Sequence, residues 1–400
     1  MGRELSVMML TWEFPPRIVG GISSHVYNLS KSLAKNGTKV YVVTCESPGA
    51  PRHEVVDGVE IFRVDSYKGP SPDFPTWVYL MNMNMQREAA AIVKSSRGDV
   101  DIFHAHDWLV ANAGIGLKHI FRKPLIATMH STQVGRNGAQ YELERMIHET
   151  EYWLTYEAWK VICCSNFMVS HLRRAFMLPE DKIVMIPNGV AFEEYKCGDN
   201  DSTWFREKFA LPEEKIVLFV GRLVYEKGVH VLVEAIPKVL ERVNAKFVIV
   251  GSGYMREDLS NLVERMGLAH KVFFTGFLDN ETLRRLQKCA DVCVVPSLFE
   301  PFGIVALEAM AAGTPVVASD TGGLSEIVEH DVTGVKVYPG DPDSLAWGIT
   351  HVLLNEDYAK RLKSKAYEKV RERYCWDEIS RRTKAIYEAV LEEYSECFWT

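Results

Sequence analysis

The sequence predicts an α/β protein made of two doubly wound, Rossmann-like domains that face one another across a cleft. Apolar runs of strand length alternate with amphipathic segments of helix length along the chain, an order that favours parallel sheets. This alternation occurs twice, before and after a polar, glycine-containing segment at residues 197–203. A chain of 400 residues is also long enough for two domains of ordinary size.

The first series begins with a strand at residues 5–10, a loop, a helix at residues 22–35 and a strand at residues 40–44. It ends at the turn Pro187-Asn188-Gly189. The second series starts near residue 216 and repeats the same order. We therefore expect a first domain at residues 1–191 and a second domain at residues 192–376.

Composition excludes several classes of protein. The net charge of -7 leaves no excess of Lys and Arg for neutralising a nucleic-acid backbone, so no nucleic-acid partner is expected. No apolar segment approaches the ~20 residues that span a bilayer, and the first residues lack a signal-peptide pattern. The eight cysteines form no CxxC pair, so neither a disulfide framework nor a zinc cluster is indicated. A cytoplasmic location is expected.

Two glutamates stand out in the stretch VVPSLFEPFGIVALEAMAAGTPVVAS. Glu300 falls in a loop after a buried strand, and Glu308 falls in the first two turns of the helix that starts near Gly303 and Ile304. A helix N-terminus attracts phosphate, whereas neighbouring carboxylates are good acceptors for sugar hydroxyls. Either acid alone would be read as a solvated surface residue. Together, beside Gly303, they indicate a site for a nucleotide-sugar.

Two further loops follow predicted strands. Gly20-Gly21 lies between a strand and a helix, where glycine lets the backbone approach a diphosphate or a sugar, although a simple turn is the alternative. In the second domain GRLVYEKG places Arg222 and Lys227 directly after a strand. At the carboxyl edge of a parallel sheet these two cations are placed to neutralise a leaving diphosphate.

Histidines mark two more strand ends. The strand DIFHAHDW carries His104 and His106 on one face, and the strand PLIATMHST ends at His130. A metal pair and ordinary core histidines are the alternatives, but no third metal ligand is evident from spacing, and we expect no metal. His106 and His130 are instead candidate contacts for a sugar or an acceptor.

A helix expected at residues 140–160 is rich in aromatic residues. Sugars stack on aromatic faces, so these side chains could line an acceptor groove. For most of them a core stripe is the favoured interpretation.

The frame FEPFGIVALEAMAAGTPVVAS, with its Glu-x7-Glu spacing, resembles the donor-site signature of retaining GT-B glycosyltransferases of family four. The similarity extends along nearly all 400 residues. It implies that Arg222 and Lys227 bind the donor diphosphate, Glu308 the ribose hydroxyls and Glu300 the donor sugar.

The same resemblance places Gly20 and Gly21 against the diphosphate and His106 near the 6-hydroxyl of the sugar. It implies that the reaction needs no metal. It implies further that the acceptor attacks the donor sugar on the face from which the phosphate leaves, and that the departing phosphate takes the proton of the acceptor. It also implies that the chain end, residues 377–400, crosses back to the first domain, for which the apolar face of the last helix is suited.

The segments WEFPPRIVGGI, HAHDWLVA and HSTQVGRNG are similar to glycogen-synthase-type α-glucosyltransferases. Starch synthases carry Lys-x-Gly-Gly where this chain has Ile18, and their second acid is usually not Glu. The donor therefore stays open between UDP-glucose, ADP-glucose and another sugar nucleotide, with an α-1,4-glucan or another hydroxyl compound as acceptor.

Three alternatives remain. The acceptor could be lipid-linked or a small molecule. A non-catalytic sugar-binding protein with two domains would share the architecture. A nicotinamide dehydrogenase would need a complete GxGxxG, and Gly251-Ser252-Gly253 is only part of one.

Overall fold

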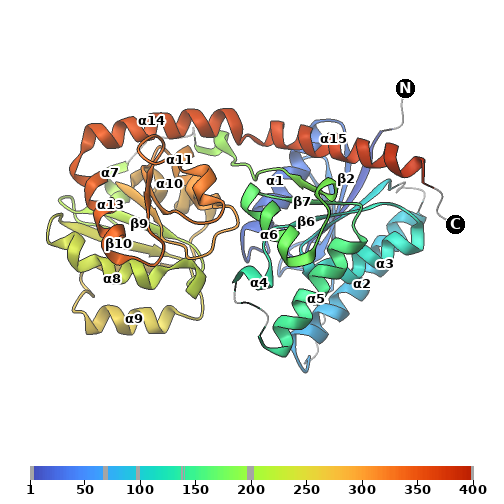
Figure 1. Ribbon diagram of the computed structural model, residues 1–400, viewed down its shortest axis with the longest axis horizontal. Helices are drawn as coiled ribbons and strands as arrows, with labels where there is room; N and C mark the ends of the chain where they lie inside the picture. The colour runs from blue at the N-terminus through green and yellow to red at the C-terminus, as the bar shows by residue number, and fades with distance from the viewer. Residues whose placement is uncertain are drawn as a thin grey trace. The chain divides into compact units, whose positions relative to one another are not determined.

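The computed structural model describes residues 4–65, 71–95, 100–136, 138, 140–195 and 202–397. Its contacts divide the chain into two units (Figure 1). Unit 1 comprises Met1–Gly189 and Trp376–Thr400, and unit 2 comprises Val190–Cys375. Most of the segment at residues 197–203, which the sequence predicts to be a linker, lies outside the described residues.

Unit 1 is built on an eight-stranded sheet with the order β3-β4-β2-β1-β5-β6-β7-β8. All neighbouring strands are parallel except β3 and β4. The strands are β1 (Ser6–Leu10), β2 (Lys39–Cys45), β3 (His53–Val56), β4 (Val59–Val64), β5 (Ile102–His106), β6 (Leu125–Met129), β7 (Lys160–Cys163) and β8 (Ile183–Met185). The helices are α1 (Gly21–Lys35), α2 (Phe74–Lys94), η1 (Trp108–Val110), α3 (Ala111–Phe121), α4 (Gln133–Arg136), α5 (Glu142–Glu157), α6 (Asn166–Phe176), η2 (Glu180–Lys182) and α15 (Trp376–Ser395).

Helices cover both faces of this sheet, which explains why β1 and β5 are buried at every residue. On one face, Val7 and Met9 of β1 share a core with α1 and α15, to which α15 contributes Tyr387 and Val390. On the other face α3 packs so closely that a Cβ on Gly114 would lie 3.3 Å from Ala105.

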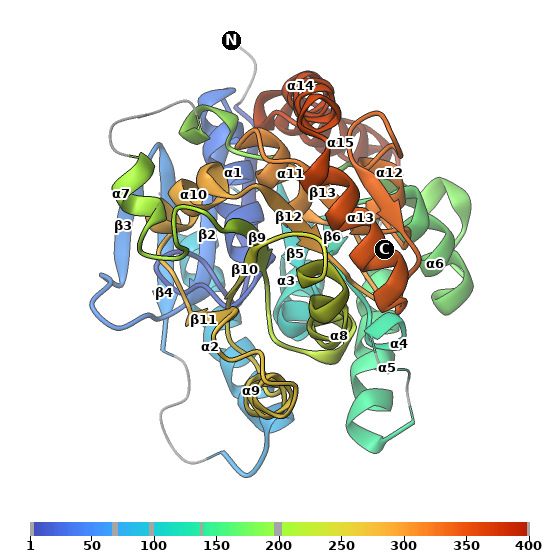
Figure 2. The ribbon, with the colours of Figure 1, turned by 90° about the vertical axis from the view of Figure 1, so that its left-hand side faces the viewer.

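Unit 2 contains a six-stranded parallel sheet with the order β11-β10-β9-β12-β13-β14. Its strands are β9 (Lys215–Val220), β10 (Ala245–Val250), β11 (Val272–Gly276), β12 (Val292–Val295), β13 (Val316–Ser319) and β14 (Val335–Val337). Its helices are η3 (Phe192–Tyr195), α7 (Ser202–Arg206), η4 (Tyr225–Lys227), α8 (Val229–Leu240), α9 (Arg256–Arg265), α10 (Asn280–Cys289), α11 (Ile304–Ala311), α12 (Leu324–Ile327), α13 (Pro342–Leu354) and α14 (Glu356–Arg373). Figures 1 and 2 place α9 and α14 at opposite sides of this unit.

Successive residues of β9 serve two cores. Val217 and Phe219 pack with α8 and α13, whereas Ile216 and Leu218 pack with α7 and α10. This alternation is what a strand covered on both faces requires. The prediction of two doubly wound parallel sheets is therefore confirmed.

The aromatic residues of α5 are a correction. Tyr152, Trp153 and Tyr156 are exposed, so they do not form the core stripe that the sequence favoured. The buried face of this helix instead contains Ile147, Glu151 and Leu154, at spacings of four and three residues. Because an α-helix turns 100° per residue, this face leaves Tyr152, Trp153 and Tyr156 on the solvent side.

Two other expectations concern cysteines and membranes. None of the seven cysteines within the described ranges forms a disulfide, and Cys197 lies outside those ranges. No helix among the described residues combines the length and the apolar character needed to cross a bilayer.

Candidate active site

The strand order of unit 2 reverses between β9 and β12, and this is where open α/β sheets bind ligands. The loop after β9 carries Arg222 and Lys227, and the loop after β12 carries Glu300. Gly228 lets the two loops touch. It adopts a φ of 66°, and a Cβ there would lie 2.0 Å from the carbonyl oxygen of Pro296. The sheet topology thus brings together residues that are some 70 positions apart.

The contact between these loops includes an ion pair. Lys227 Nζ lies 2.7 Å from Glu300 Oε2, and the hydroxyl of Ser297 donates to the same oxygen at 3.0 Å. The Lys227 and Glu300 side chains are 23% and 11% exposed. Arg222 pairs with Glu226 at 3.3 Å and keeps about half of its side-chain surface exposed. The site therefore offers two cations, each paired with a carboxylate, and the Lys227 pair is the shorter and more buried of the two.

The backbone of Glu300 is held by a glycine pair that the sequence analysis missed. Gly323 N–H donates to the Glu300 carbonyl at 2.8 Å. Gly322, with a φ of 54°, approaches so closely that a Cβ would lie 2.0 Å from that oxygen. The signal was present in the sequence, because Gly322-Gly323 closely follows the apolar run VVAS, which forms β13.

Helix α11 begins at Ile304, directly after Gly303. Gly303 adopts a φ of 112°, and a Cβ there would lie 2.5 Å from the side chain of Leu324. Glycine is therefore required at this helix start by both its dihedral angle and its packing. N–H groups in the first turn of a helix lack partners within the helix, so this end suits an anion.

Glu308 lies in the second turn of α11 and is half-buried. Burial raises its pKa to about 7, against the opposing effect of a hydrogen bond at 3.4 Å from the Gln287 side chain. Tyr195 in turn donates to the amide oxygen of Gln287 at 3.1 Å. Gln287 and Tyr195 were missed because each stands alone in an ordinary helical segment.

The order of strands in unit 1 reverses between β1 and β5. Gly20 ends the loop after β1 and Gly21 is the first residue of α1, so the pair lies between a strand and a helix, as predicted from sequence. Gly20 has an extended backbone with a φ of -157°, and its N–H donates to Glu13 Oε2 at 2.8 Å. Val19 N–H donates to the same oxygen at 2.6 Å. Burial raises the pKa of Glu13, and these N–H donors oppose the rise. A buried carboxylate, which sequence analysis missed, therefore fixes this loop.

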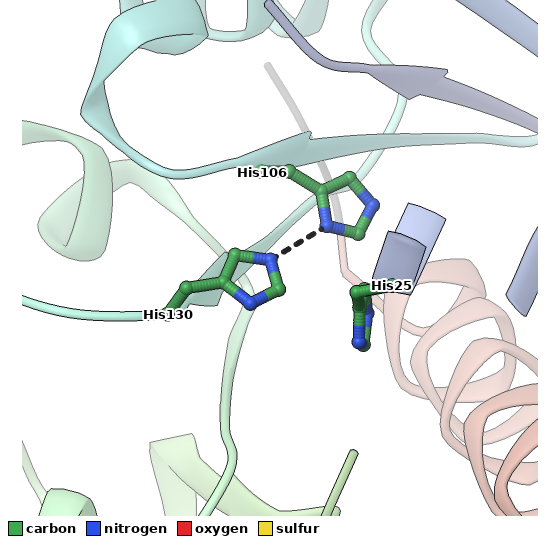
Figure 3. A group of neighbouring side chains, drawn as sticks. All are labelled: His25, His106 and His130. Atoms are coloured by element: carbon green, nitrogen blue, oxygen red, sulfur yellow. Dashed lines mark hydrogen bonds between the residues drawn. The ribbon is translucent and has the colours of Figure 1, made fainter. Parts of the chain in front are cut away.

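Three histidines of unit 1 gather beside that loop (Figure 3): His25 from α1, His106 from the end of β5 and His130 from the residue after β6. Their ligand nitrogens lie within 4.8 Å of one another. His106 Nδ1 and His130 Nε2 are 3.2 Å apart and share a hydrogen bond. His25 was missed, although its spacing to Leu29 and Leu33 places it on the inner face of its helix.

Burial lowers the pKa of each of these three histidines, that of His25 to about 4. The rings are therefore neutral at pH 7. Beside them Asp107 accepts a hydrogen bond from the backbone N–H of His130 at 2.7 Å, and burial raises the pKa of this acid to about 7.

His104 lies in a different environment. Its two ring nitrogens bond to the Tyr387 hydroxyl and to the Thr128 hydroxyl, both at 2.7 Å. It therefore ties α15 to the sheet, as a core histidine does. The alternative of a metal pair formed by His104 and His106 finds no support in this arrangement.

A separate pocket of about 390 Å³ lies in unit 1 between α2, α3 and α5. Its lining includes Tyr79, Trp108, Asn112 and Met146. It contains none of the residues that the sequence predicts for the donor site.

Two protein families match this chain, and the boundary between the two matched regions lies close to the boundary between the two units. Residues 19–194 match the family Glycosyltransferase Family 4, and residues 201–369 match Glycosyl transferases group 1. An uncharacterized glycosyltransferase of Methanocaldococcus jannaschii is 42% identical over 392 residues, which cover 97% of this chain and 99% of the relative. A glycogen synthase of Mycobacterium tuberculosis is 33% identical over 402 residues, covering 96% of this chain and 94% of that enzyme.

Among solved structures, a sucrose-phosphate synthase from Thermosynechococcus elongatus superposes with a TM-score of 0.83 at 26% identity. The match covers 97% of this chain and all of that chain. The chain therefore belongs to the family 4, group 1 glycosyltransferases, retaining enzymes of GT-B fold that use a nucleotide-sugar.

Proposed function

We propose that this enzyme transfers glucose from UDP-glucose or ADP-glucose to a growing α-1,4-glucan. The observation that carries the donor site is the Lys227–Glu300 ion pair at the switch point of the unit 2 sheet. The similarity to a glycogen synthase along almost the whole chain supports glucose and a glucan.

In this proposal each group has a separate task. Arg222 and Lys227 stabilise the charge that develops on the leaving diphosphate. Gly303 and Ile304 present the start of α11 to a phosphate, and Glu308 accepts hydrogen bonds from the ribose hydroxyls. Glu300 accepts from hydroxyls of the transferred sugar, while its ion pair keeps Lys227 in position.

The residues of unit 1 are proposed to contact the sugar and the diphosphate. Gly20 and Gly21 provide backbone without side chains at the start of α1, and His106 contacts the 6-hydroxyl. His130 is a further candidate for a contact with the sugar or the acceptor. The departing phosphate takes the proton of the attacking hydroxyl on the same face of the sugar, so no carboxylate acts as nucleophile and no metal is needed.

A small acceptor is the second candidate. The similarity to a sucrose-phosphate synthase supports this candidate. A small sugar phosphate is therefore the acceptor to test. A sugar-binding protein without catalysis would bind a nucleotide-sugar and release nothing.

The test is the release of nucleoside diphosphate from a panel of nucleotide-sugars. Each is assayed alone, with maltooligosaccharide and with fructose 6-phosphate. Glucan synthesis requires that release from UDP-glucose or ADP-glucose rises with maltooligosaccharide and that the oligosaccharide grows. A rise only with the sugar phosphate would support the second candidate, and no release from any donor would contradict both.

A further inference from the structure

We propose that His25, His106 and His130 form a binding site for one divalent metal ion, with Zn²⁺ as the preferred ion, and that the bound ion inhibits transfer. The three rings come from separate elements of unit 1 and converge on one point (Figure 3). Imidazole nitrogen is a preferred ligand of Zn²⁺, Cu²⁺ and Ni²⁺.

The distances between the ligand nitrogens are those of a metal site in which the His25 ring lies slightly too far from the other two. In a tetrahedral zinc site with Zn–N distances of about 2.0–2.1 Å, two ligand nitrogens lie roughly 3.4 Å apart. His106 Nδ1 and His130 Nε2 are 3.2 Å apart. All three ligand nitrogens lie within 4.8 Å of one another, so the His25 ring needs to move by roughly 1–2 Å to complete the set.

His25 is already oriented as a ligand. Its Nδ1 lies 2.8 Å from the side-chain oxygen of Asn188, and because that oxygen only accepts, Nδ1 carries the proton. The lone pair of the neutral ring is then on Nε2. A polar group that fixes one ring nitrogen while the other faces the metal is the usual arrangement around metal-binding histidines.

Two buried nitrogens in this cluster lack a partner among the described residues: Nε2 of His25 and Nε2 of His106. The side chains are 5% and 0% exposed. Buried polar atoms nearly always have a hydrogen-bond partner, so the unpartnered Nε2 of His25, the atom offered to the ion, points to a missing ligand. His106 would ligate through Nδ1, so its own unpartnered Nε2 does not add to this argument. His104, close to His106, shows the contrasting case of a ring with both nitrogens bonded.

The surroundings suit a cation. Each neutral ring has one lone pair, and the proton of the His106–His130 hydrogen bond moves to the other nitrogen of its ring when the ion takes its place. The buried carboxyl of Asp107, which contacts the His130 backbone, ionises more readily beside a cation. His130 is only half-buried, so an ion has a route from solvent and a water molecule can complete the coordination.

Inhibition rests on the proposed function. His106 is proposed to contact the 6-hydroxyl of the donor sugar, and a ring that ligates an ion through one nitrogen no longer presents the same face to that hydroxyl. We therefore expect Zn²⁺ to compete with the nucleotide-sugar, and a chelator to restore full activity.

Binding is tested without any reference to transfer. Untagged full-length protein, stripped of metal, is titrated with Co²⁺ while visible absorption is followed, and then with Zn²⁺ in competition. One Co²⁺ per chain with the intense bands of a tetrahedral site is expected. His25→Phe keeps a ring of similar shape but removes both nitrogens, and should weaken binding at least 100-fold. Asn188→Ala should weaken it about 10- to 100-fold.

His351→Asn, a histidine of α13 in unit 2, serves as the control and should bind the ion as the unaltered chain does. Thermal melts establish that the His25 and Asn188 variants are folded. Absence of the Co²⁺ bands, or equal affinity in folded His25→Phe, would overturn the site.

The second arm measures transfer with and without Zn²⁺ at several donor concentrations. Competitive inhibition that is absent in His25→Phe is expected. Metal binding without any transfer activity would refute the proposed function alone, whereas transfer with no metal binding would refute this inference alone. Binding without inhibition would refute the placement of the ion at the sugar contact.

Discussion

Lys227 is the residue on which most of the proposed chemistry depends. Its ammonium has three donors, of which one is used by Glu300, so two remain for phosphate oxygens. The ion pair holds the ammonium, and a cation held in place costs little reorganisation when charge develops. Arg222 is more exposed and is held by a longer contact to Glu226.

We predict that Lys227→Ala and Arg222→Ala each lower kcat by about 10² while the fold is retained, because both charges act when the diphosphate departs. Steady-state kinetics with the best donor gives the numbers. The matched control is Lys238→Ala, which removes an exposed ion pair with Asp343 and should leave kcat unchanged. Turnover close to that of the unaltered enzyme in either site variant would contradict the assignment.

The second residue-scale prediction concerns Glu308, whose pKa burial raises to about 7. A carboxylate accepts hydrogen bonds from ribose hydroxyls better than a protonated acid, so donor affinity should rise as pH increases through this value. KM for the donor, measured on either side of pH 7, should fall on the alkaline side. Glu308→Gln should raise KM and remove this pH dependence; if the slope persists in this variant, another group is responsible.

The sequence indicated Arg222, Lys227 and Glu300 because each follows a strand in a βαβ order that sends loops to one edge of the sheet, and Glu308 because it lies in the helix after such a loop; their roles stay predictions. Nothing in the sequence indicated Gln287, Tyr195 or His25. These residues reach their sites through packing between distant segments, and a local pattern carries no information about such contacts. Glu13 was missed for a related reason, since its two backbone donors lie on the far side of a loop.

Among the elements, the start of α11 is the most constrained. Gly303 combines a positive φ with a Cβ position that would meet Leu324 at 2.5 Å. Gly267 has a φ of 71° but nothing within 4 Å of its Cβ position. A comparison of alanine substitutions at Gly303 and Gly267 therefore separates the cost of backbone strain from the cost of overpacking.

We predict that Gly267→Ala lowers the free energy of unfolding by about 1–2 kcal/mol through strain alone. Gly303→Ala should lose a further 1–3 kcal/mol or so through overpacking, and donor KM should rise because α11 shifts. Denaturant titration of both variants measures the difference. Equal losses would show that Leu324 moves aside without cost.

Helix α5 holds the segment after β6 through one buried acid. Both side-chain oxygens of Glu151 accept from the Gln133 N–H, at 2.9 and 3.1 Å, and burial raises the pKa of this acid to about 8. The folded state therefore binds a proton between pH 4.5 and about 8 that the unfolded state has released. The stabilisation that protonated Glu151 contributes to the fold is fully present below pH 4.5 and is lost as pH rises through about 8.

We predict that the Glu151→Gln variant is less sensitive to pH than the unaltered protein over this window, by an amount on the order of a few kcal/mol. Thermal melts at a series of pH values give the comparison. Glu149→Gln changes an exposed acid on the same helix and should reproduce the unaltered profile. Parallel profiles for Glu151→Gln and the unaltered protein would show that Glu151 is ionised in the fold.

At the scale of the whole molecule, two doubly wound sheets were predictable because strand and helix periodicities alternate twice along the chain. The order of strands was not, since local periodicity does not specify which strands become neighbours. Yet that order explains the site in each unit: the switch point between β9 and β12 collects Arg222, Lys227 and Glu300, and the one between β1 and β5 collects Gly20 and His106.

Unit 2 has the features of a part that folds alone. Its two cores draw only on its own residues. Its ends are paired, because Val190 N–H donates to the Tyr374 carbonyl at 3.0 Å and Val190 forms a bridge with Cys375. Arg222, Lys227 and Glu308, the side chains proposed to bind the diphosphate and the ribose, lie within it, whereas Gly20 and Gly21, proposed to lie against the diphosphate, and His106 lie in unit 1.

We therefore predict that a fragment of residues 190–375 folds, binds nucleoside diphosphate and transfers no sugar. Calorimetry with UDP and ADP measures binding, and the release assay measures transfer. The same fragment with Lys227→Ala is the control, and it should bind at least 10-fold more weakly because the diphosphate loses a charged partner. A folded fragment that binds neither nucleotide would show that the donor site depends on residues outside unit 2, and transfer by the fragment would show that Gly20, Gly21 and His106 are dispensable.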